Sequence, residues 1–242
     1  MTPAGPNERG GTLVGVGVGP GDPRLLTLRA LDELRRADRV IAPCVAPDTA
    51  GRAEGIVRSA APELAIERLT FDMGPDRDAS HQAAAEQLLA PLDAGERVAF
   101  VTLGDPNIYS TFSALTTAVR ERRPGLEIET VPGIMAFQEL AARADTVLLD
   151  GTESLHLVTA LEGPAGVEAA LEDLDAAVIV YKGGRHLPAI ADALGRSGRL
   201  DGAVFGELLG LPGERICGVG DAGDNPATYL ATVIVPPKRR SR

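Results

Sequence analysis

The chain has 242 residues, of which 44% are apolar, and a formal net charge of −10 at pH 7. This length suits one large domain or two small ones, and the apolar fraction provides ample material for a buried core. The acidic balance argues against a broad phosphate-neutralising face and therefore against nucleic acid as the main partner. The sequence has neither a stretch near the roughly 20 apolar residues that cross a bilayer nor a signal-peptide core, so we expect a cytoplasmic protein without membrane attachment.

Short runs rich in Val, Ile and Leu alternate with amphipathic stretches along the whole chain. This alternation predicts an α/β protein. The predicted strands are residues 12–17, 39–42, 64–69, 98–103, 126–131, 154–160, 177–182, 203–209 and 229–235. The predicted helices include residues 25–36, 114–123, 166–174 and 187–195.

The strongest break in this pattern lies near the middle of the chain. A helical pattern ends in Arg-Arg and is followed by Pro124-Gly125, which separates two halves of similar size. Pro and Gly together are typical of a turn or a linker. We therefore expect an N-terminal α/β domain of residues 1–123 and a C-terminal α/β domain of residues 124–242. The two cysteines, Cys44 and Cys217, have no ligand spacing around them, and no metal site is predicted.

A glycine-rich loop, GVGVGPGDP at residues 15–23, follows the first predicted strand. A dinucleotide site would require G-x-G-x-x-G, but Pro20 or Asp22 stands where the third glycine should be. Proline lacks an N–H donor and the carboxylate repels phosphate, so the loop is a poor pyrophosphate cradle. The alternative is a plain turn before a helix capped by Asp22 or Thr27.

Two further loops follow predicted strands, Gly104-Asp105-Pro106 and Val131-Pro132-Gly133. In open α/β sheets ligands bind beyond the carboxyl ends of the strands, so these loops and residues 15–23 are expected to face one crevice. Carboxylates and close backbone suit a ligand with sulfonium charge and ribose hydroxyls better than one with phosphates. The charge pattern thus favours S-adenosylmethionine over NAD or ATP.

These segments, taken together in order, resemble a known family. The motifs are GVGPGDPRLLTLRA, VTLGDPNIYSTF, VPGI, VIVYKGGRH and GELLGLPGERI, with FDM at residues 71–73. They span nearly the whole chain and resemble the tetrapyrrole methylases, most similarly the precorrin-2 C20-methyltransferases of cobalamin biosynthesis. The resemblance implies a two-domain α/β methyltransferase, usually a homodimer, that binds S-adenosylmethionine between its domains and releases S-adenosylhomocysteine.

The resemblance also implies individual site residues, most of which would act through their backbone. Asp105 ranks first among the side chains that would contact the cofactor. The cofactor contacts would be Pro20, Leu103, Gly104, Asp105, Ile108, Met135, Ala136, Lys182 and Leu209. The substrate contacts would be Tyr109, Ser110, Arg185 and His186, with Tyr109 as the catalytic candidate.

Several interpretations of these residues stay open. Tyr109 would either orient the proton that leaves the methylated carbon or pack with its hydroxyl on a backbone carbonyl. For Ser110 and Thr111, a role as caps of the following helix is favoured over a contact with the substrate. The segment from Met135 to Leu140 departs from the family pattern and favours, as an alternative, a methylase of the same fold with another substrate.

The remaining open questions concern substrate charge and class of protein. Precorrin-2 carries many carboxylates, so an acidic protein would need a local basic patch, for which Arg52, Arg143, Arg185 and His186 are the candidates. Further alternatives are a non-catalytic protein that binds S-adenosylmethionine and, ranked lowest, a nucleotide-dependent oxidoreductase.

Overall fold

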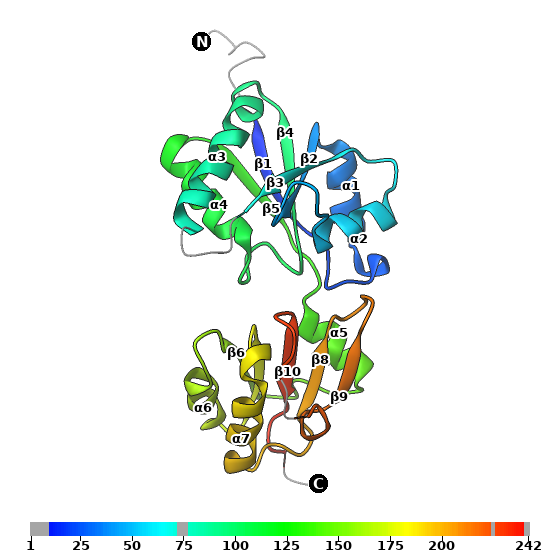
Figure 1. Ribbon diagram of the computed structural model, residues 1–242, viewed down its shortest axis with the longest axis vertical. Coiled ribbons are helices and arrows are strands. Elements are labelled where there is room, and N and C mark those ends of the chain that lie inside the picture. The colour runs from blue at the N-terminus through cyan, green and yellow to red at the C-terminus, as the bar shows by residue number, and fades with distance from the viewer. Residues whose placement is uncertain (1–9, 72–76, 224–225, 240–242) are drawn as a thin grey trace. The chain divides into compact units, whose positions relative to one another are not determined.

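The computed structural model describes residues 10–71, 77–223 and 226–239. It divides the chain into two compact units, Met1–Met135 and Ala136–Arg242, which we call the first and second domains (Figure 1). Each domain contains one five-stranded sheet with helices, which confirms the α/β class. The division comes later than the predicted one after residue 123, because residues 127–131 form an edge strand of the first sheet.

The first domain contains a parallel sheet with the strand order β3-β2-β4-β1-β5. The central strands are buried on both faces, which explains their continuous apolar runs. β1 lies between β4 and β5 and pairs with both in parallel register. The strands are β1 (Thr12–Gly17), β2 (Arg39–Cys44), β3 (Ile66–Thr70), β4 (Arg97–Thr102) and β5 (Glu127–Val131).

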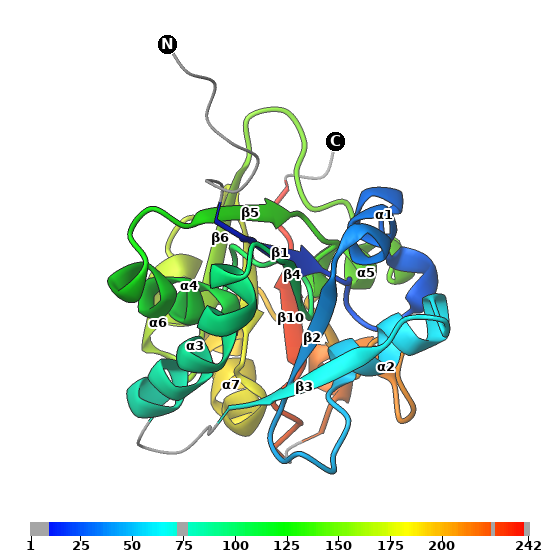
Figure 2. The ribbon, with the colours of Figure 1, turned by 90° about the horizontal axis from the view of Figure 1, so that it is seen from above.

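Helices cover both faces of this sheet. α3 and α4 lie on one face and α1 and α2 on the other (Figure 2). Phe100 and Leu115 belong to the core on the first face, and Leu34 and Ile56 belong to the core on the second. The helices are η1 (Pro23–Leu25), α1 (Leu28–Arg36), α2 (Arg52–Ala60), α3 (Arg77–Asp93) and α4 (Thr111–Arg122).

The second domain contains a mixed sheet with the strand order β6-β7-β10-β8-β9. β6 and β7 are parallel, whereas β10 and β8 pair antiparallel with their neighbours. Leu187, Ile190 and Leu194 of α7 pack with Val178 and Phe205 in one core. The elements are α5 (Ala136–Arg143), β6 (Ser154–Thr159), α6 (Ala165–Leu171), β7 (Ala176–Tyr181), η2 (Gly184–His186), α7 (Leu187–Ser197), β8 (Val204–Glu207), β9 (Arg215–Gly218), η3 (Val219–Asp221) and β10 (Ala231–Val235).

Local capping decides several element boundaries. Asp22 accepts a hydrogen bond from the Arg24 amide and caps η1, and Thr27 accepts one from the Ala30 amide and caps α1. Of the two cap candidates, Thr27 thus caps the α-helix, which begins at Leu28 and not at residue 25 as predicted, whereas Asp22 caps the short η1 before it. The motif residues Asp72 and Met73 lie outside the described residues. In the part of the chain that the structure describes, no helix has the length and apolar character of a membrane span.

Candidate functional site

Three loops of the first domain meet backbone to backbone, as the sequence predicted. Gly19 and Gly104 form an isolated bridge, in which the Gly104 amide donates to the Gly19 carbonyl at 2.9 Å. A Cβ on Gly17 would lie 2.5 Å from the Gly104 carbonyl oxygen, and one on Gly133 would lie 2.0 Å from the same oxygen. These positions exclude any side chain. The loops after β1, β4 and β5 thus converge at the edge of the sheet where ligands bind.

Asp105 ties two of these loops together. One carboxylate oxygen accepts from the Asn107 amide at 2.8 Å and the other accepts from the Gly133 amide at 3.1 Å. The residue is 8% exposed. A buried carboxylate that accepts hydrogen bonds from backbone N–H groups is held firmly, because such hydrogen bonds are charge-assisted. Asp105 therefore fixes the geometry of the crevice as well as its charge.

Asp22, the second acid of the predicted crevice, has a different environment. Its carboxylate pairs with the Arg24 guanidinium at 2.5 Å and also caps η1. Arg24 directly follows the loop of residues 15–23, so its compensating charge is close by. Among the residues that the structure describes, Asp105 has no ion pair, so it supplies the uncompensated negative charge of the two acids.

The remaining cofactor candidates of the first domain come from the same three loops. Pro20 and Gly104 are buried, Leu103 and Ile108 are half-buried, and Met135 is 8% exposed. A Cβ on Gly104 would lie 3.2 Å from the Met135 sulfur, so this methionine covers the turn after β4. The structure brings these residues together within one domain.

Tyr109 and Ser110 follow in the same loop but differ in their surroundings. Tyr109 is 46% exposed and has a φ of 49°, in the left-handed region. The Ser110 hydroxyl accepts from the Phe112 amide at 3.1 Å and shares a hydrogen bond with the Thr102 hydroxyl at 2.8 Å. Ser110 is thus the N-cap of α4. Of the two, Tyr109 has the side chain that is presented to solvent.

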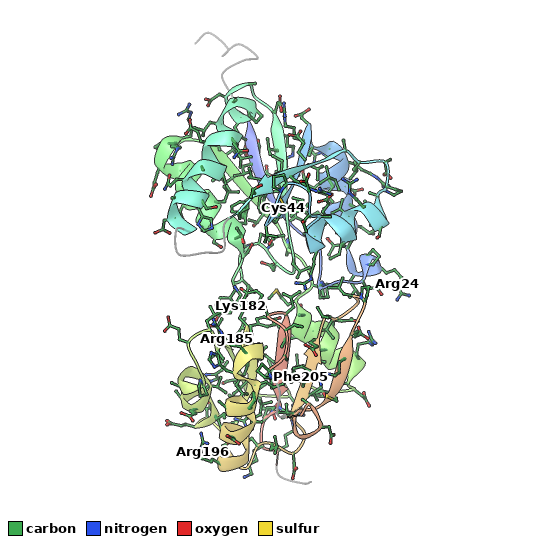
Figure 3. All side chains as sticks on the ribbon, viewed as in Figure 1. Arg24, Cys44, Lys182, Arg185, Arg196 and Phe205 are labelled. Atoms are coloured by element: carbon green, nitrogen blue, oxygen red, sulfur yellow. The ribbon has the colours of Figure 1, made fainter. Side chains whose placement is uncertain are left out.

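In the second domain, Lys182 stands at the end of β7, and Figure 3 shows it at the same end of the domain as Arg185. Its φ is 57°, and its ammonium group lies 5.7 Å from the centroid of the Tyr229 ring. The turn beyond it is tightly held, because a Cβ on Gly184 would lie 1.9 Å from the Thr228 carbonyl oxygen. The backbone on either side of Lys182 is therefore held in place, and this fixes the point from which the Lys182 side chain extends.

Tyr181, the residue before Lys182, anchors the start of α5. Its hydroxyl accepts from the Phe137 amide at 3.0 Å. Burial raises the pKa of Tyr181, although hydrogen bonds from the backbone of Phe137 and Ala136 oppose this shift. Tyr181 thereby positions Ala136, a predicted cofactor contact. This role was not predicted from the sequence, where the available signal was a tyrosine at the end of a wholly buried strand.

Leu209 lies in the turn after β8 and is 4% exposed. The preceding Leu208 has a φ of 52°. The Gly210 amide donates to the Glu214 carboxylate at 2.7 Å, which closes the turn. The backbone of Leu209 is therefore held in a closed turn while its side chain is buried, so Leu209 would contact a ligand through its backbone atoms.

The proposed basic patch is only partly available. Arg143 pairs with Glu214 at 2.6 Å and with Glu139 at 3.4 Å, so its charge is already compensated. Arg185 is exposed, and His186 is half-buried at the N-cap position of α7. Arg185 therefore remains the exposed cation of this loop.

Unusual backbone conformations occur at or next to several of the predicted site residues. Among the described residues, the non-glycine residues with left-handed φ are Tyr109, Asp145, Lys182 and Leu208. Such conformations cost on the order of 1–3 kcal/mol each and gather at functional sites. Two of the four are predicted site residues and a third precedes Leu209, which supports a functional role for these turns.

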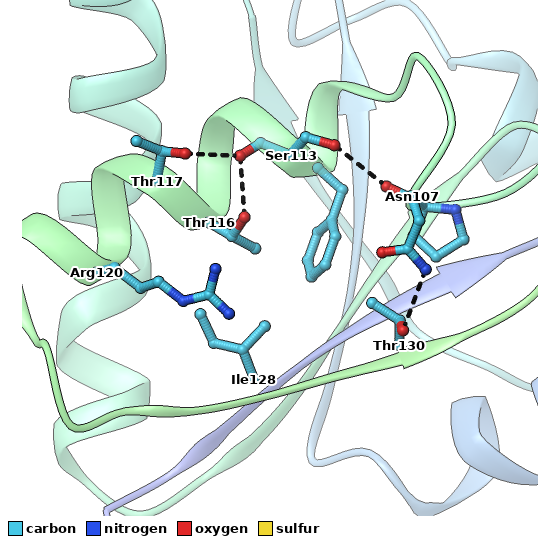
Figure 4. A pocket seen from close by; sticks show the side chains of 9 residues that line it. Asn107, Ser113, Thr116, Thr117, Arg120, Ile128 and Thr130 are labelled. Atoms are coloured by element: carbon cyan, nitrogen blue, oxygen red, sulfur yellow. Dashed lines mark hydrogen bonds between the residues drawn. The ribbon is translucent and has the colours of Figure 1, made fainter.

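Two pockets of about 400 Å³ each flank the Tyr109 loop within the first domain. One lies between α4 and β5 and is lined by Asn107, Thr116, Arg120 and Thr130, among others (Figure 4). The other is lined by Cys44, Arg52, Phe71 and Thr111, among others.

Comparisons with known proteins identify the family and the fold of the chain. A family model for tetrapyrrole (corrin/porphyrin) methylases matches residues 12–223. The fold resembles the crystal structure of the methyltransferase CobJ with a TM-score of 0.68 and 24% identity, covering 96% of this chain and 97% of that one.

Two named relatives match almost from end to end. The chain is 33% identical over 238 residues to a precorrin-2 C(20)-methyltransferase from Sinorhizobium sp, covering 93% of this chain and 95% of the relative. It is 32% identical over 235 residues to a cobalt-precorrin-2 C(20)-methyltransferase from Salmonella typhimurium, covering 93% and 96%. The chain therefore belongs to the tetrapyrrole methylases.

Proposed function

We propose that this methyltransferase transfers a methyl group from S-adenosylmethionine to C20 of precorrin-2, or of its cobalt-bearing counterpart, in cobalamin biosynthesis. The observation that carries the proposal is the similarity, over 93% of the chain, to two proteins named for this reaction. Each of those relatives is itself covered at 95% or more, so the similarity is not confined to one domain.

The first domain fits a sulfonium nucleoside. The three loops contain no Lys or Arg at residues 15–20, 103–108 or 131–135, and Asp105 contributes a buried carboxylate. A positively charged sulfur is favoured beside such a carboxylate, whereas phosphate is not. We propose that the first domain contacts the donor through Pro20, Leu103, Gly104, Asp105, Ile108 and Met135, and the second through Ala136, Lys182 and Leu209.

The chemistry requires alignment more than acid catalysis. S-adenosylmethionine, when bound, supplies an electrophilic methyl group on a sulfur that leaves as a neutral thioether. Correct orientation of two reactants recovers on the order of 7–11 kcal/mol of barrier. The fixed loops around Asp105 and Tyr181 provide such orientation, because their backbone positions are set by hydrogen bonds and close contacts. We propose that Tyr109, Ser110, Arg185 and His186 contact the acceptor, with Tyr109 nearest the carbon that gains the methyl and loses a proton.

The direct test is methylation by the purified protein. Incubation with S-adenosylmethionine and precorrin-2, or its cobalt-bearing oxidised counterpart, is expected to add the mass of one methyl group and release S-adenosylhomocysteine. Mass spectrometry of the tetrapyrrole measures the first, and chromatography of the nucleoside measures the second.

The alternatives give different results in the same assay. Absence of a mass gain on both tetrapyrroles would remove this substrate assignment. Calorimetric binding of S-adenosylmethionine without release of its product on any acceptor would instead indicate a non-catalytic binding protein.

We further propose that the protein is a cytoplasmic homodimer. Three exposed apolar side chains support a subunit contact, namely Val147, Leu149 and Leu155 at and before the edge strand β6. Sedimentation equilibrium of the wild type measures the oligomeric state, and a monomer at micromolar concentration would contradict this proposal.

A further inference from the structure

The pocket that contains Arg52 includes none of the proposed donor contacts and is suited to a different ligand. It lies where β2 and β3 end, and Thr111 closes it from the first turn of α4. Ligands bind at this edge of a parallel sheet. Thr111 also comes two residues after Tyr109, so the pocket adjoins the loop that carries the catalytic candidate.

The walls of this pocket combine an apolar surface with a cation. Phe71, Cys44 and Val45 line it, and Val45 is 67% exposed although it is apolar. Arg52 lines the same pocket, which has no acidic residue among its described lining. This pairing suits a flat apolar ring with a carboxylate at its edge.

Arg52 differs from most arginines of the first domain. Arg39, Arg68 and Arg97, for example, are all paired with glutamates. No hydrogen bond or ion pair of the Arg52 side chain occurs among the residues that the structure describes, and the same holds for the hydroxyl of Thr49 on the pocket wall. An unpaired guanidinium is the preferred partner of a carboxylate, because it donates two parallel hydrogen bonds.

The loop that carries this pocket is held by a close backbone contact and by hydrogen bonds. A Cβ on Gly51 would lie 2.2 Å from the Pro43 carbonyl oxygen, so the loop returns closely onto β2. The Arg68 guanidinium donates to the Pro47 carbonyl at 2.8 Å and to the buried Glu54 carboxylate at 2.7 Å. The pocket is therefore formed before a ligand arrives, which lowers the entropic cost of binding.

We propose that the Arg52 pocket binds one pyrrole ring of the acceptor together with its carboxylate arm. The ring packs on the exposed Val45 over a floor that includes the buried Phe71, and the carboxylate accepts hydrogen bonds from Arg52, with Thr49 and Thr111 as further donors. The proposal rests on a tetrapyrrole as the acceptor, as proposed above. It makes Arg52 a residue for substrate recognition that takes no part in donor binding.

The second pocket provides a matched control. Arg120 also lies exposed in a pocket of about 400 Å³ in the same domain, beside Thr116 and Ile128 (Figure 4). Its walls are mostly polar, and Thr116 and Thr117 already donate to the Ser113 carbonyl. Arg120→Gln removes one positive charge from the same acidic domain and changes no residue that lines the Arg52 pocket.

The experiment measures binding of uroporphyrin, an octacarboxylate tetrapyrrole, by its fluorescence, without S-adenosylmethionine. Arg52→Gln is expected to weaken binding about tenfold, as for the loss of one hydrogen-bonded charge pair, whereas Arg120→Gln changes it less than about twofold. Val45→Glu, at the exposed mouth of the pocket, is expected to weaken binding as well, because it opposes the carboxylate. In the methylation assay Arg52→Gln should raise KM and leave kcat unchanged.

The outcomes separate this proposal from the proposed function. Equal weakening in both arginine variants would show a general charge effect and would overturn the pocket assignment, as would unchanged binding in Arg52→Gln and Val45→Glu. If the wild type binds uroporphyrin through Arg52 but methylates neither tetrapyrrole, the pocket stands and the reaction assignment fails. Thermal unfolding of each variant verifies that it is folded.

Discussion

Each domain binds its own end of the connecting segment through a different kind of hydrogen-bond acceptor. In the first domain the buried Asp105 carboxylate accepts the Gly133 amide, and in the second the Tyr181 hydroxyl accepts the Phe137 amide. Gly133 and Phe137 bracket Met135 and Ala136, which are both predicted donor contacts. A charged acceptor gives stronger hydrogen bonds than a neutral one, so the first attachment should contribute more to stability.

The largest expected effect comes from removal of the charged acceptor. Asp105→Ala leaves the Asn107 and Gly133 amides without the buried carboxylate that accepts their partly buried hydrogen bonds, and it should lower the free energy of unfolding by about 3 kcal/mol. Urea unfolding measures this loss, and calorimetry should show weaker binding of S-adenosylmethionine.

Asp105→Asn is the matched control for this change. It keeps one acceptor and the side-chain volume, so its loss should be clearly smaller. Equal stability of the wild type and Asp105→Ala would contradict the role of Asp105 in fixing the two loops.

An intermediate effect is expected at Glu54, a second buried carboxylate of the first domain. Hydrogen bonds from Arg68 and Arg58 hold the pKa of Glu54 below its ordinary value of 4.5, although burial opposes this. Both arginines are partly exposed, so Glu54→Gln should cost about 2 kcal/mol of unfolding free energy at neutral pH.

The pH dependence of this loss has a definite sign. Because the folded pKa of Glu54 is lowered, its contribution is present above 4.5 and is lost as pH falls through the folded value. The difference between wild type and Glu54→Gln should therefore shrink in acid, and a difference that persists or grows there would refute the mechanism.

The smallest effect is expected at the neutral acceptor. Tyr181→Phe removes one hydrogen bond to the Phe137 amide and should cost about 1 kcal/mol. Burial raises the pKa of Tyr181 above its ordinary value of 10, so this contribution is constant in acid and at neutral pH and declines only above that value. Tyr229→Phe, at a tyrosine of the same domain that is 49% exposed, serves as the control and should change stability little. Acid-dependent loss in Tyr181→Phe would contradict the assignment of a neutral acceptor at this position.

The sequence predicted the parts of the fold that depend on local pattern. Caps at Asp22 and Thr27 and the alternation of strands and helices follow from nearest neighbours, and the convergence of the loops at Gly17, Gly104 and Gly133 followed from the rule for parallel sheets. The short strand β9 was missed because its four residues include one strongly apolar side chain, Ile216.

The partners of side chains were less predictable. Asp105 was singled out for charge, but its bond to Gly133 depends on the adjacency of loops that are far apart in sequence. Tyr181 resembles an ordinary core residue until the position of α5 is known. The pairing of Arg143 with Glu214 likewise depends on a turn closed elsewhere in the second domain, so the candidate basic patch was overestimated.

The position of β1 between β4 and β5 has a consequence for synthesis on the ribosome. β1 begins at Thr12, yet its two neighbours begin at Arg97 and Glu127, so it emerges long before either partner exists. Pairings between such distant segments form slowly, and a central apolar strand without its neighbours is prone to aggregate. The whole first domain must therefore leave the exit tunnel before Gly17, Gly104 and Gly133 can meet. Binding of the nascent chain by chaperones should be strongest just before β5 has emerged.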